Sequence, residues 1–236
     1  MGLRYGGDMG RVARVVSPGM PHHITQRGNR RMPTFIEESD YGVYVDLMRT
    51  WCGRDGVAIV AYCLMPNHVH LIAVPDTVEG LARAVGEAHR RYTCYINGRE
   101  GWRGYLWQGR FGSFVMHHDY FLTAMRYVEL NPVRAGRVAS PADWPWSSAR
   151  AHLTGAVDPL MGDVREMIAN IGDWGQCPAL SVEEAELVRL RQHTRTGRPL
   201  GESFIQRIEE ALGRFVRKRK PRPRGPRKEQ LSIVSP

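Results

Sequence analysis

The 236-residue chain lacks the features that mark a membrane protein or an exported, cross-linked protein. No apolar run approaches the roughly 20 residues that a membrane-spanning helix needs, and the first residues show no charged-then-apolar export pattern. The four cysteines lie far apart without any C-x-x-C spacing, which argues against a zinc knuckle and against a disulfide framework. We therefore expect a cytoplasmic globular protein with no membrane partner.

Acidic residues are missing from one stretch near the C-terminus, "RFVRKRKPRPRGPRK" at 214–228, which contains nine basic residues. The remaining 24 of the 33 basic residues balance the 24 acidic ones, so the formal net charge of +9 belongs to this stretch. Alternating Pro and Arg keep such a segment extended. One interpretation is a solvated charge run that only aids solubility. We favour a disordered basic tail over 214–236 that contacts DNA. The tail residues predicted to bind DNA are Arg217, Lys218, Arg219, Lys220, Arg222 and Arg224.

Hydrophobic periodicity predicts an α+β domain over residues 11–150, after a disordered N-terminus at 1–10. Strands are expected at the start of 22–29, in 57–65 and 68–75, which form a hairpin around "PNH", and in 109–118. Helices are expected in 38–56, 78–98 and 119–132. The order is β-α-β-β-α-β plus a further helix. It predicts a ferredoxin-like split βαβ fold, an antiparallel sheet with helices on one face.

A small helical region is predicted to follow at residues 151–213. Ser181 and Glu184 form an S-x-x-E capping box that would open a helix ending near residue 192. The stretch "TRTGRPLG" interrupts it, and a second helix with one apolar face resumes at 202–215. Two helices joined by a Gly/Pro turn could form a DNA-binding helix-turn-helix, although such pairs are also common in purely structural roles.

Two histidines interrupt an apolar strand in "AYCLMPNHVHLIAVP". Residues two apart in a strand face the same side about 7 Å apart, so His68 and His70 could converge on one metal ion. Val69 and Leu71 would then pack into the core. Taken alone, two structural histidines explain the pattern equally well. No suitably spaced Cys or Glu supplies a further strong zinc ligand.

Tyr127 and Asn131 lie four residues apart in the predicted helix 119–132, hence on one face. A tyrosine facing the core and a helix-terminal Asn before Pro would be an ordinary structural arrangement. If this face of the helix meets the histidine pair, however, the carboxamide oxygen of Asn131 could complete the ligand shell of a metal while the phenol of Tyr127 points at a substrate.

The stretches "HHITQRGNRR", "YCLMPNHVHLI", "LWQGRF" and "RYVELNPVRAGRV…DWPWSS" together closely resemble the REP-associated tyrosine transposases. These belong to the HUH superfamily of single-strand DNA transposases that use one catalytic tyrosine. The resemblance covers roughly residues 14–148. It implies that His68 and His70 bind a divalent metal, Mg²⁺ or Mn²⁺. It also implies that Tyr127 is the catalytic nucleophile and that Asn131 is a third, amide-type metal ligand.

The resemblance further implies a metal-dependent transposase and endonuclease. Such an enzyme cleaves and rejoins single-stranded DNA hairpins of palindromic repeats through a covalent 5′-phosphotyrosine, as a monomer or homodimer. The alternative is a non-catalytic DNA-binding protein or repressor derived from a transposase. A ribonuclease is a further alternative, but it would need a general acid/base pair that is not evident in the sequence.

Single strands of DNA are held by cationic grooves and by stacking of bases on aromatic side chains. The candidates for these contacts are Arg27, Arg30, Arg31, Trp107 and Arg110. Trp144 and Trp146 are expected to pack against the sheet.

Overall fold

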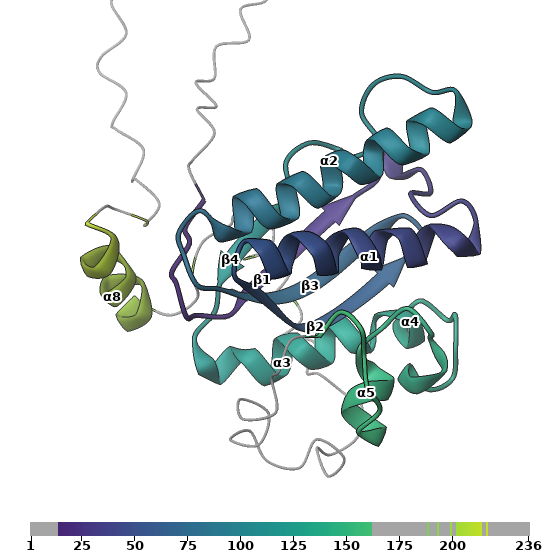
Figure 1. Ribbon diagram of the computed structural model, residues 1–236. Coiled ribbons are helices and arrows are strands. Elements are labelled where there is room, and N and C mark those ends of the chain that lie inside the picture. Colours follow the sequence, from purple (N-terminus) through teal and green to yellow (C-terminus); the bar gives the residue numbers. More distant parts are fainter. Residues whose placement is uncertain are drawn as a thin grey trace, which may run out of the picture.

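The computed structural model describes residues 14–161, 188, 193, 199, 202–213 and 216. Within these residues, one antiparallel sheet is formed by four strands in the spatial order β2-β3-β1-β4. The strands are β1 (His22–Arg27), β2 (Val57–Met65), β3 (His68–Pro75) and β4 (Gly112–Val115). A two-residue turn joins β2 to β3, so the predicted hairpin is present. This order and connectivity confirm the ferredoxin-like split βαβ fold (Figure 1).

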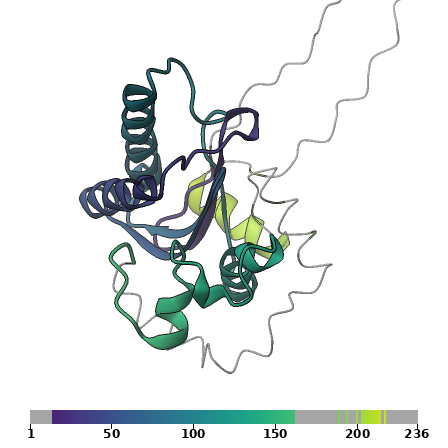
Figure 2. The same cartoon turned by 90° about the vertical axis from the view of Figure 1, so that its right-hand side faces the viewer.

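Two long helices, α1 (Glu38–Arg54) and α2 (Gly80–Glu100), lie side by side over one face of the sheet (Figures 1 and 2). Alternate residues of β3, including Val69 and Leu71, are fully buried against this layer. Tyr44 of α1 and Tyr92 of α2 are among the largest side chains enclosed there. The predicted layer of helices on one face is therefore confirmed for α1 and α2.

The further helix, α3 (His118–Glu129), covers the opposite face of the sheet (Figure 1). Phe121, Met125 and Val128 of α3 form a second core cluster with residues of β2 and β3, among them Val60 and Ile72. The short helices α4 (Asn131–Arg134) and α5 (Ala149–Thr154) follow on this side. Because both faces of β2 are covered, its sequence is a continuous apolar run rather than an alternating one.

The outer edge of β2 is closed by the stretch "DWPWSS". The backbone N–H of Leu64 donates to the carbonyl of Trp146, and Ser148 N–H donates to the carbonyl of Tyr62. The indole of Trp144 donates to the Leu64 carbonyl at 3.0 Å. These bonds use the backbone groups that an edge strand would otherwise expose to pairing with another chain. The expectation that this stretch packs against the sheet is confirmed.

A buried ion pair ties α1 to the far end of α2. Asp40, in the first turn of α1, is fully buried and accepts hydrogen bonds from the backbone N–H groups of Ile36 (2.8 Å) and Glu37 (2.9 Å). The guanidinium of Arg99 donates to both carboxylate oxygens, in one case at 3.0 Å. Burial raises the pKa of Asp40, but the hydrogen bonds from Arg99, Glu37 and Ile36 outweigh it, so the net shift is downward.

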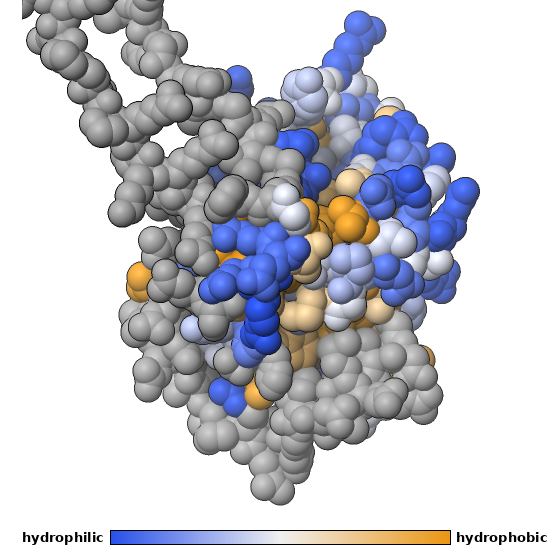
Figure 3. Space-filling view, turned by 90° about the vertical axis from the view of Figure 1, so that its left-hand side faces the viewer, coloured by the Kyte–Doolittle hydropathy of each residue, from blue (hydrophilic) through white to orange (hydrophobic). Residues whose placement is uncertain are grey.

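The C-terminal helix α8 (Glu202–Leu212) packs beside β4, at the other edge of the sheet (Figure 1). On this side of the molecule, hydrophilic side chains surround a smaller hydrophobic area (Figure 3). Its residues Phe204 and Ile208 are buried against Val15 and Val115, as its apolar face predicted. The predicted N-terminal segment 1–10 lies outside the described residues, as does most of the first helix of the proposed helix-turn-helix. Among the residues that are described, no helix is both long and apolar enough to cross a membrane.

Candidate active site

A cavity of about 960 Å³ opens at the end of the sheet where β1 ends and β3 begins. Four residues singled out from the sequence for their chemistry line it together: His68, His70, Tyr127 and Asn131. Three of the predicted DNA-binding arginines, Arg27, Arg31 and Arg110, also line it. The fold thus brings residues that are up to 106 positions apart in the chain, Thr25 and Asn131, to one cavity.

The two histidines of β3 face the same side of the sheet, as their spacing predicted. His70 is buried, His68 is half-buried, and their ring centroids lie 5.2 Å apart. Val69 and Leu71, which alternate with them, are fully buried in the opposite core. The period of the strand therefore separates the histidines from the core residues.

Asn67 fixes the orientation of the His68 ring. The side-chain N–H of Asn67 donates to the Arg31 carbonyl at 3.1 Å, which turns the carboxamide oxygen toward His68 Nδ1 at 2.6 Å. A carboxamide oxygen can only accept, so Nδ1 carries the proton and Nε2 keeps its lone pair. A ring held in this way through its second nitrogen is typical of metal-binding histidines.

A third histidine, His23 of β1, supports His70 in the same way. Its Nε2 lies 3.0 Å from His70 Nδ1, and the two rings stack with centroids 5.2 Å apart. When His70 Nδ1 donates this bond, His70 Nε2 is left with a lone pair for a metal or substrate. We did not identify His23 from the sequence, because its position depends on the β1–β3 register, which places Thr25 opposite His70.

All three rings are held in the neutral form. Burial lowers the pKa of His23 to about 3 and that of His68 to about 4, where the nearby Arg27 charge adds to the effect. Burial, followed by the neighbouring histidines and arginines, lowers the pKa of His70 well below its ordinary value. Neutral imidazoles are the form that can bind a metal.

Tyr127 reaches the histidines from α3. Its ring centroid lies 5.5 Å from that of His70 and 5.9 Å from that of His23, with the rings nearly perpendicular. Arg134 of α4 lies over the Tyr127 ring, its guanidinium carbon 4.3 Å from the centroid, and donates to the Tyr127 carbonyl at 2.5 Å. Arg134 was not identified from the sequence. The chain must turn after α3 before this residue can return to the tyrosine.

Asn131 lines the same cavity, but it does not share one regular helix with Tyr127. The predicted helix 119–132 ends at Glu129, and Asn131 begins the separate helix α4. Pro132 explains the break, because proline has no backbone N–H and its ring is excluded from a helix interior. The predicted shared face is therefore replaced by two successive helices that border one cavity.

The two imidazoles and the carboxamide at this cavity would supply only part of the ligand set of a divalent cation. Within the described part of the chain, no group of three or more His, Cys, Asp or Glu side chains could hold a metal ion. His23 does not complete such a group, since its Nε2 faces His70. A cation here would rely on two imidazoles, the Asn131 carboxamide and oxygen atoms brought by a substrate.

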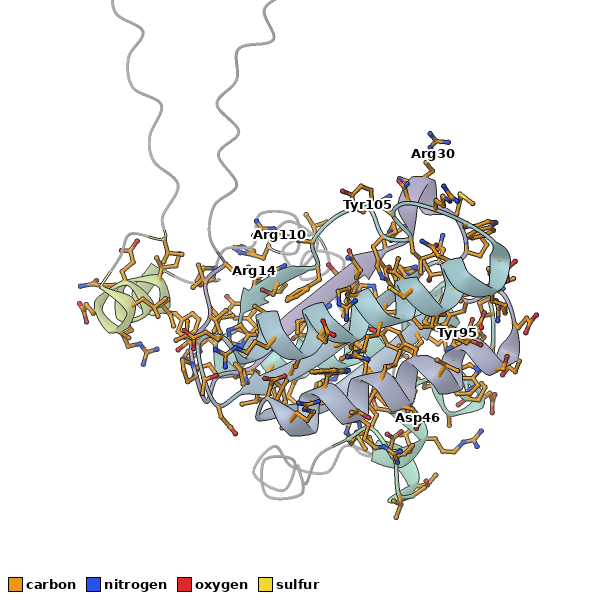
Figure 4. The ribbon with its side chains drawn as sticks, turned by 45° about the horizontal axis from the view of Figure 1, so that its top comes forward. Arg14, Arg30, Asp46, Tyr95, Tyr105 and Arg110 are labelled. Atoms are coloured by element: carbon orange, nitrogen blue, oxygen red, sulfur yellow. The ribbon has the colours of Figure 1, made fainter. Side chains whose placement is uncertain are left out.

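The predicted DNA-binding residues are distributed unequally. Arg30 and Arg31 are exposed on the short 3₁₀ turn η1 (Asn29–Arg31), and Arg30 projects from the tip of the molecule (Figure 4). Gly28 precedes this turn. A Cβ atom there would lie 2.3 Å from the carbonyl oxygen of Met32, so only glycine fits. The six tail residues from Arg217 to Arg224 lie outside the described residues, and their role stays a prediction.

Trp107, a predicted base-stacking residue, is largely buried. Its side chain is only 6% exposed, and its ring packs against His89 with centroids 4.8 Å apart. What remains accessible of the ring borders a second cavity beside α2, and its role in DNA binding stays a prediction. Tyr105, two residues earlier, is 87% exposed and offers the free aromatic ring of this segment (Figure 4).

A ferredoxin-like sheet whose paired histidines face one tyrosine is the arrangement that the resemblance to the single-tyrosine transposases implies. Residues 17–131 match the family described as "Transposase IS200 like". This confirms the resemblance found in the sequence.

Two related proteins are REP-associated tyrosine transposases by name. The one from Haemophilus influenzae is 26% identical over 135 residues, 52% of this chain and 70% of the relative. The one from Escherichia coli K12 is 25% identical over 116 residues, 47% of this chain and 67% of the relative. A solved structure of a REP-associated tyrosine transposase bound to a REP hairpin covers 66% of this chain and 93% of its own. Its TM-score is 0.54 at 22% identity, a likeness of fold.

Proposed function

We propose that this transposase cleaves and rejoins single-stranded DNA at hairpins of palindromic repeats, with Tyr127 as the nucleophile. The observation that carries the proposal is the position of the Tyr127 ring, 5.5 Å from that of His70 in a cavity also lined by His68 and Asn131. A binding protein without catalysis needs no such meeting of a phenol and two neutral imidazoles. The hairpin substrate is inferred from the relatives named above.

The residues that would hold a divalent cation are His68 and His70, through Nε2, and Asn131, through its carboxamide oxygen. The orientation of both rings through Nδ1 supports this assignment. Amide and phosphate oxygens favour Mg²⁺ or Mn²⁺ over zinc. Such a cation would supply charge neutralisation at the scissile phosphate.

Tyr127 would attack phosphorus through its phenolic oxygen. The new O–P bond gives a 5′-phosphotyrosine, the P–O3′ bond breaks, and the departing strand takes up a proton to end in a free 3′-hydroxyl. Arg134 supports this step, because its guanidinium packs over the Tyr127 ring and helps to hold the tyrosine at the cavity. A second 3′-hydroxyl can attack the same phosphorus and release Tyr127. Strands are then joined without a high-energy cofactor.

The arginines around the cavity would hold the strand. Arg27, Arg31 and Arg110 line the cavity and can contact phosphates on either side of the scissile bond. The basic tail at 214–236 would add affinity for duplex in the hairpin or beside it. We propose that the protein acts in the cytoplasm, as a monomer or a homodimer.

A covalent adduct tests the proposal. The protein is incubated with a stem-loop oligonucleotide with single-stranded flanks and Mg²⁺ or Mn²⁺, then denatured. A label at the 3′ end of the DNA should stay with the protein, and a 5′ label should appear on a released fragment. Tyr127→Phe should abolish the adduct and preserve binding. Tyr120→Phe, on the same helix and outside the cavity lining, is the matched control.

Two results would reject this function. An adduct that survives Tyr127→Phe would show that another residue is the nucleophile. Binding by the unaltered protein without any adduct, with either metal, would favour the alternative of a non-catalytic DNA-binding protein or repressor.

A further inference from the structure

A second cavity, of about 480 Å³, lies beside the candidate active site, between α2 and the segment that leads into β4. The two cavities share three lining residues, Gln26, Gly109 and Arg110. Because Arg110 borders both cavities, a DNA strand that leaves the first would have to pass this residue to reach the second. Its volume lies within the range of about 300–1,000 Å³ that is typical of small-ligand sites.

The wall of this second cavity is aromatic. His89 and Trp107 lie with ring centroids 4.8 Å apart, and Phe111 meets His89 edge-on at 6.2 Å. Tyr105, which also lines the cavity, is 87% exposed, so its ring can move onto a ligand (Figure 4). Flat aromatic surfaces of this kind bind flat groups, and DNA bases stack on them regardless of sequence.

The rim of the cavity is cationic. The Arg14 guanidinium lies over the Phe111 ring, 3.6 Å from its centroid, and Arg110 lies on the same edge of the molecule (Figure 4). Burial, and then the positive charge of Arg110, lower the pKa of Arg14 to about 10. A phosphate between the two arginines would relieve this repulsion. An aromatic wall with a cationic rim matches a base attached to its sugar-phosphate.

One buried polar atom in the wall lacks a partner among the described residues. His89 Nε2 lies 2.9 Å from the hydroxyl of Tyr44, whose pKa burial raises well above its ordinary value, so Tyr44 stays protonated. If Tyr44 donates this bond, the proton of His89 lies on Nδ1, which has no hydrogen-bond partner. A carbonyl oxygen or ring nitrogen of a base could accept from it after a small shift of the neighbouring rings.

We infer that the second cavity receives one unpaired base of the strand that is cut in the first, with Tyr105 stacked on that base. The identity of the strand rests on the proposed function, but binding of the base requires no chemistry at Tyr127. The base would fix the register of the strand and so decide which phosphate lies at the nucleophile.

Gly86 of α2 provides a direct way to fill the cavity. It lines the cavity, and a Cβ atom built on it meets no heavy atom within 4 Å, so Gly86→Phe can project a ring into the space. Gly98 is also in α2 and also has open space, but it lies outside the cavity lining, so Gly98→Phe is the matched control. Both changes replace glycine in a helix and should not lower helix stability.

Fluorescence anisotropy measures affinity for a stem-loop oligonucleotide chosen from a pool with randomised single-stranded flanks. Each flanking base is then replaced in turn by an abasic site. With the unaltered protein and with Gly98→Phe, one position should weaken binding by about 5- to 100-fold when its base is removed. With Gly86→Phe, affinity should already be reduced, and removing that base should have no further effect. Tyr105→Ala should lose part of the same difference, and Tyr105→Phe should keep it.

The inference is overturned if Gly86→Phe binds like Gly98→Phe, or if the penalty for the missing base persists in Gly86→Phe. These results are independent of the adduct assay. A protein that forms no adduct can still show the abasic penalty, and one that forms an adduct can lack it.

Discussion

His23 offers the most direct test of how the candidate site is built. Its Nε2, 3.0 Å from His70 Nδ1, is the contact that would leave a lone pair on the other nitrogen of His70. We expect His23→Phe to lower adduct formation at limiting Mn²⁺ by about 10- to 100-fold, the usual cost of losing a partner that orients a metal ligand. That range corresponds to about 1.4–2.7 kcal/mol.

The same substitution should also lower stability. It leaves the buried Nδ1 of His70 without a partner, which costs about 1–3 kcal/mol in the free energy of unfolding. His22→Phe is the control, since His22 is equally buried but bonds the backbone of Met20 (2.7 Å) and Ser17 (3.2 Å), away from the cavity.

Initial rates of adduct formation across a Mn²⁺ titration, with urea denaturation in parallel, separate the two effects. His22→Phe should lose stability but keep its metal dependence. If His23→Phe keeps the rate and metal dependence of the unaltered protein, the proposed role of the His23–His70 contact is wrong.

Three further predictions concern Arg134, Asp40 and the basic tail. Arg134→Ala should slow adduct formation by about tenfold or more, because the guanidinium that packs over the Tyr127 ring would no longer hold the tyrosine in place; Arg134→Lys should restore part of the rate. Asp40→Ala should cost about 3 kcal/mol in urea denaturation, against under about 0.5 kcal/mol for the exposed Asp46→Ala. The pKa of Asp40 is lower in the folded protein than in the unfolded chain, where it is about 3.9. Asp40 should therefore stabilise the fold fully above that unfolded pKa, and this stabilisation should be lost as pH falls through the folded pKa. Removing 214–236 should weaken DNA binding and flatten its salt dependence; unchanged salt dependence would exclude the tail from binding.

Local periodicity was enough to predict much of the fold and part of the site. The two-residue spacing of His68 and His70 put both on one side of a strand, and the order of strands and helices gave the topology. Tyr127 was proposed because the motif around it resembles the family motif, since its helical position alone fits a core tyrosine. In each of these cases, the information is contained within a few consecutive residues.

The remaining parts of the site depend on contacts between distant segments. His23 meets His70 only through the register of two strands that are neighbours in space, and Arg134 reaches Tyr127 only after the chain breaks at Pro132. Trp107 is a residue type that commonly stacks on bases, but its low exposure depends on how the preceding loop folds over α2. No local pattern reports these distances or exposures.

The β3 histidines and the α3 tyrosine come from one molecule and border the same hollow. A second copy is therefore not required to donate the nucleophile, as it would be in an assembly that exchanges helices between subunits. Cleavage per molecule should consequently survive dilution, and mixing an inactive tyrosine variant with an inactive histidine variant should restore no activity.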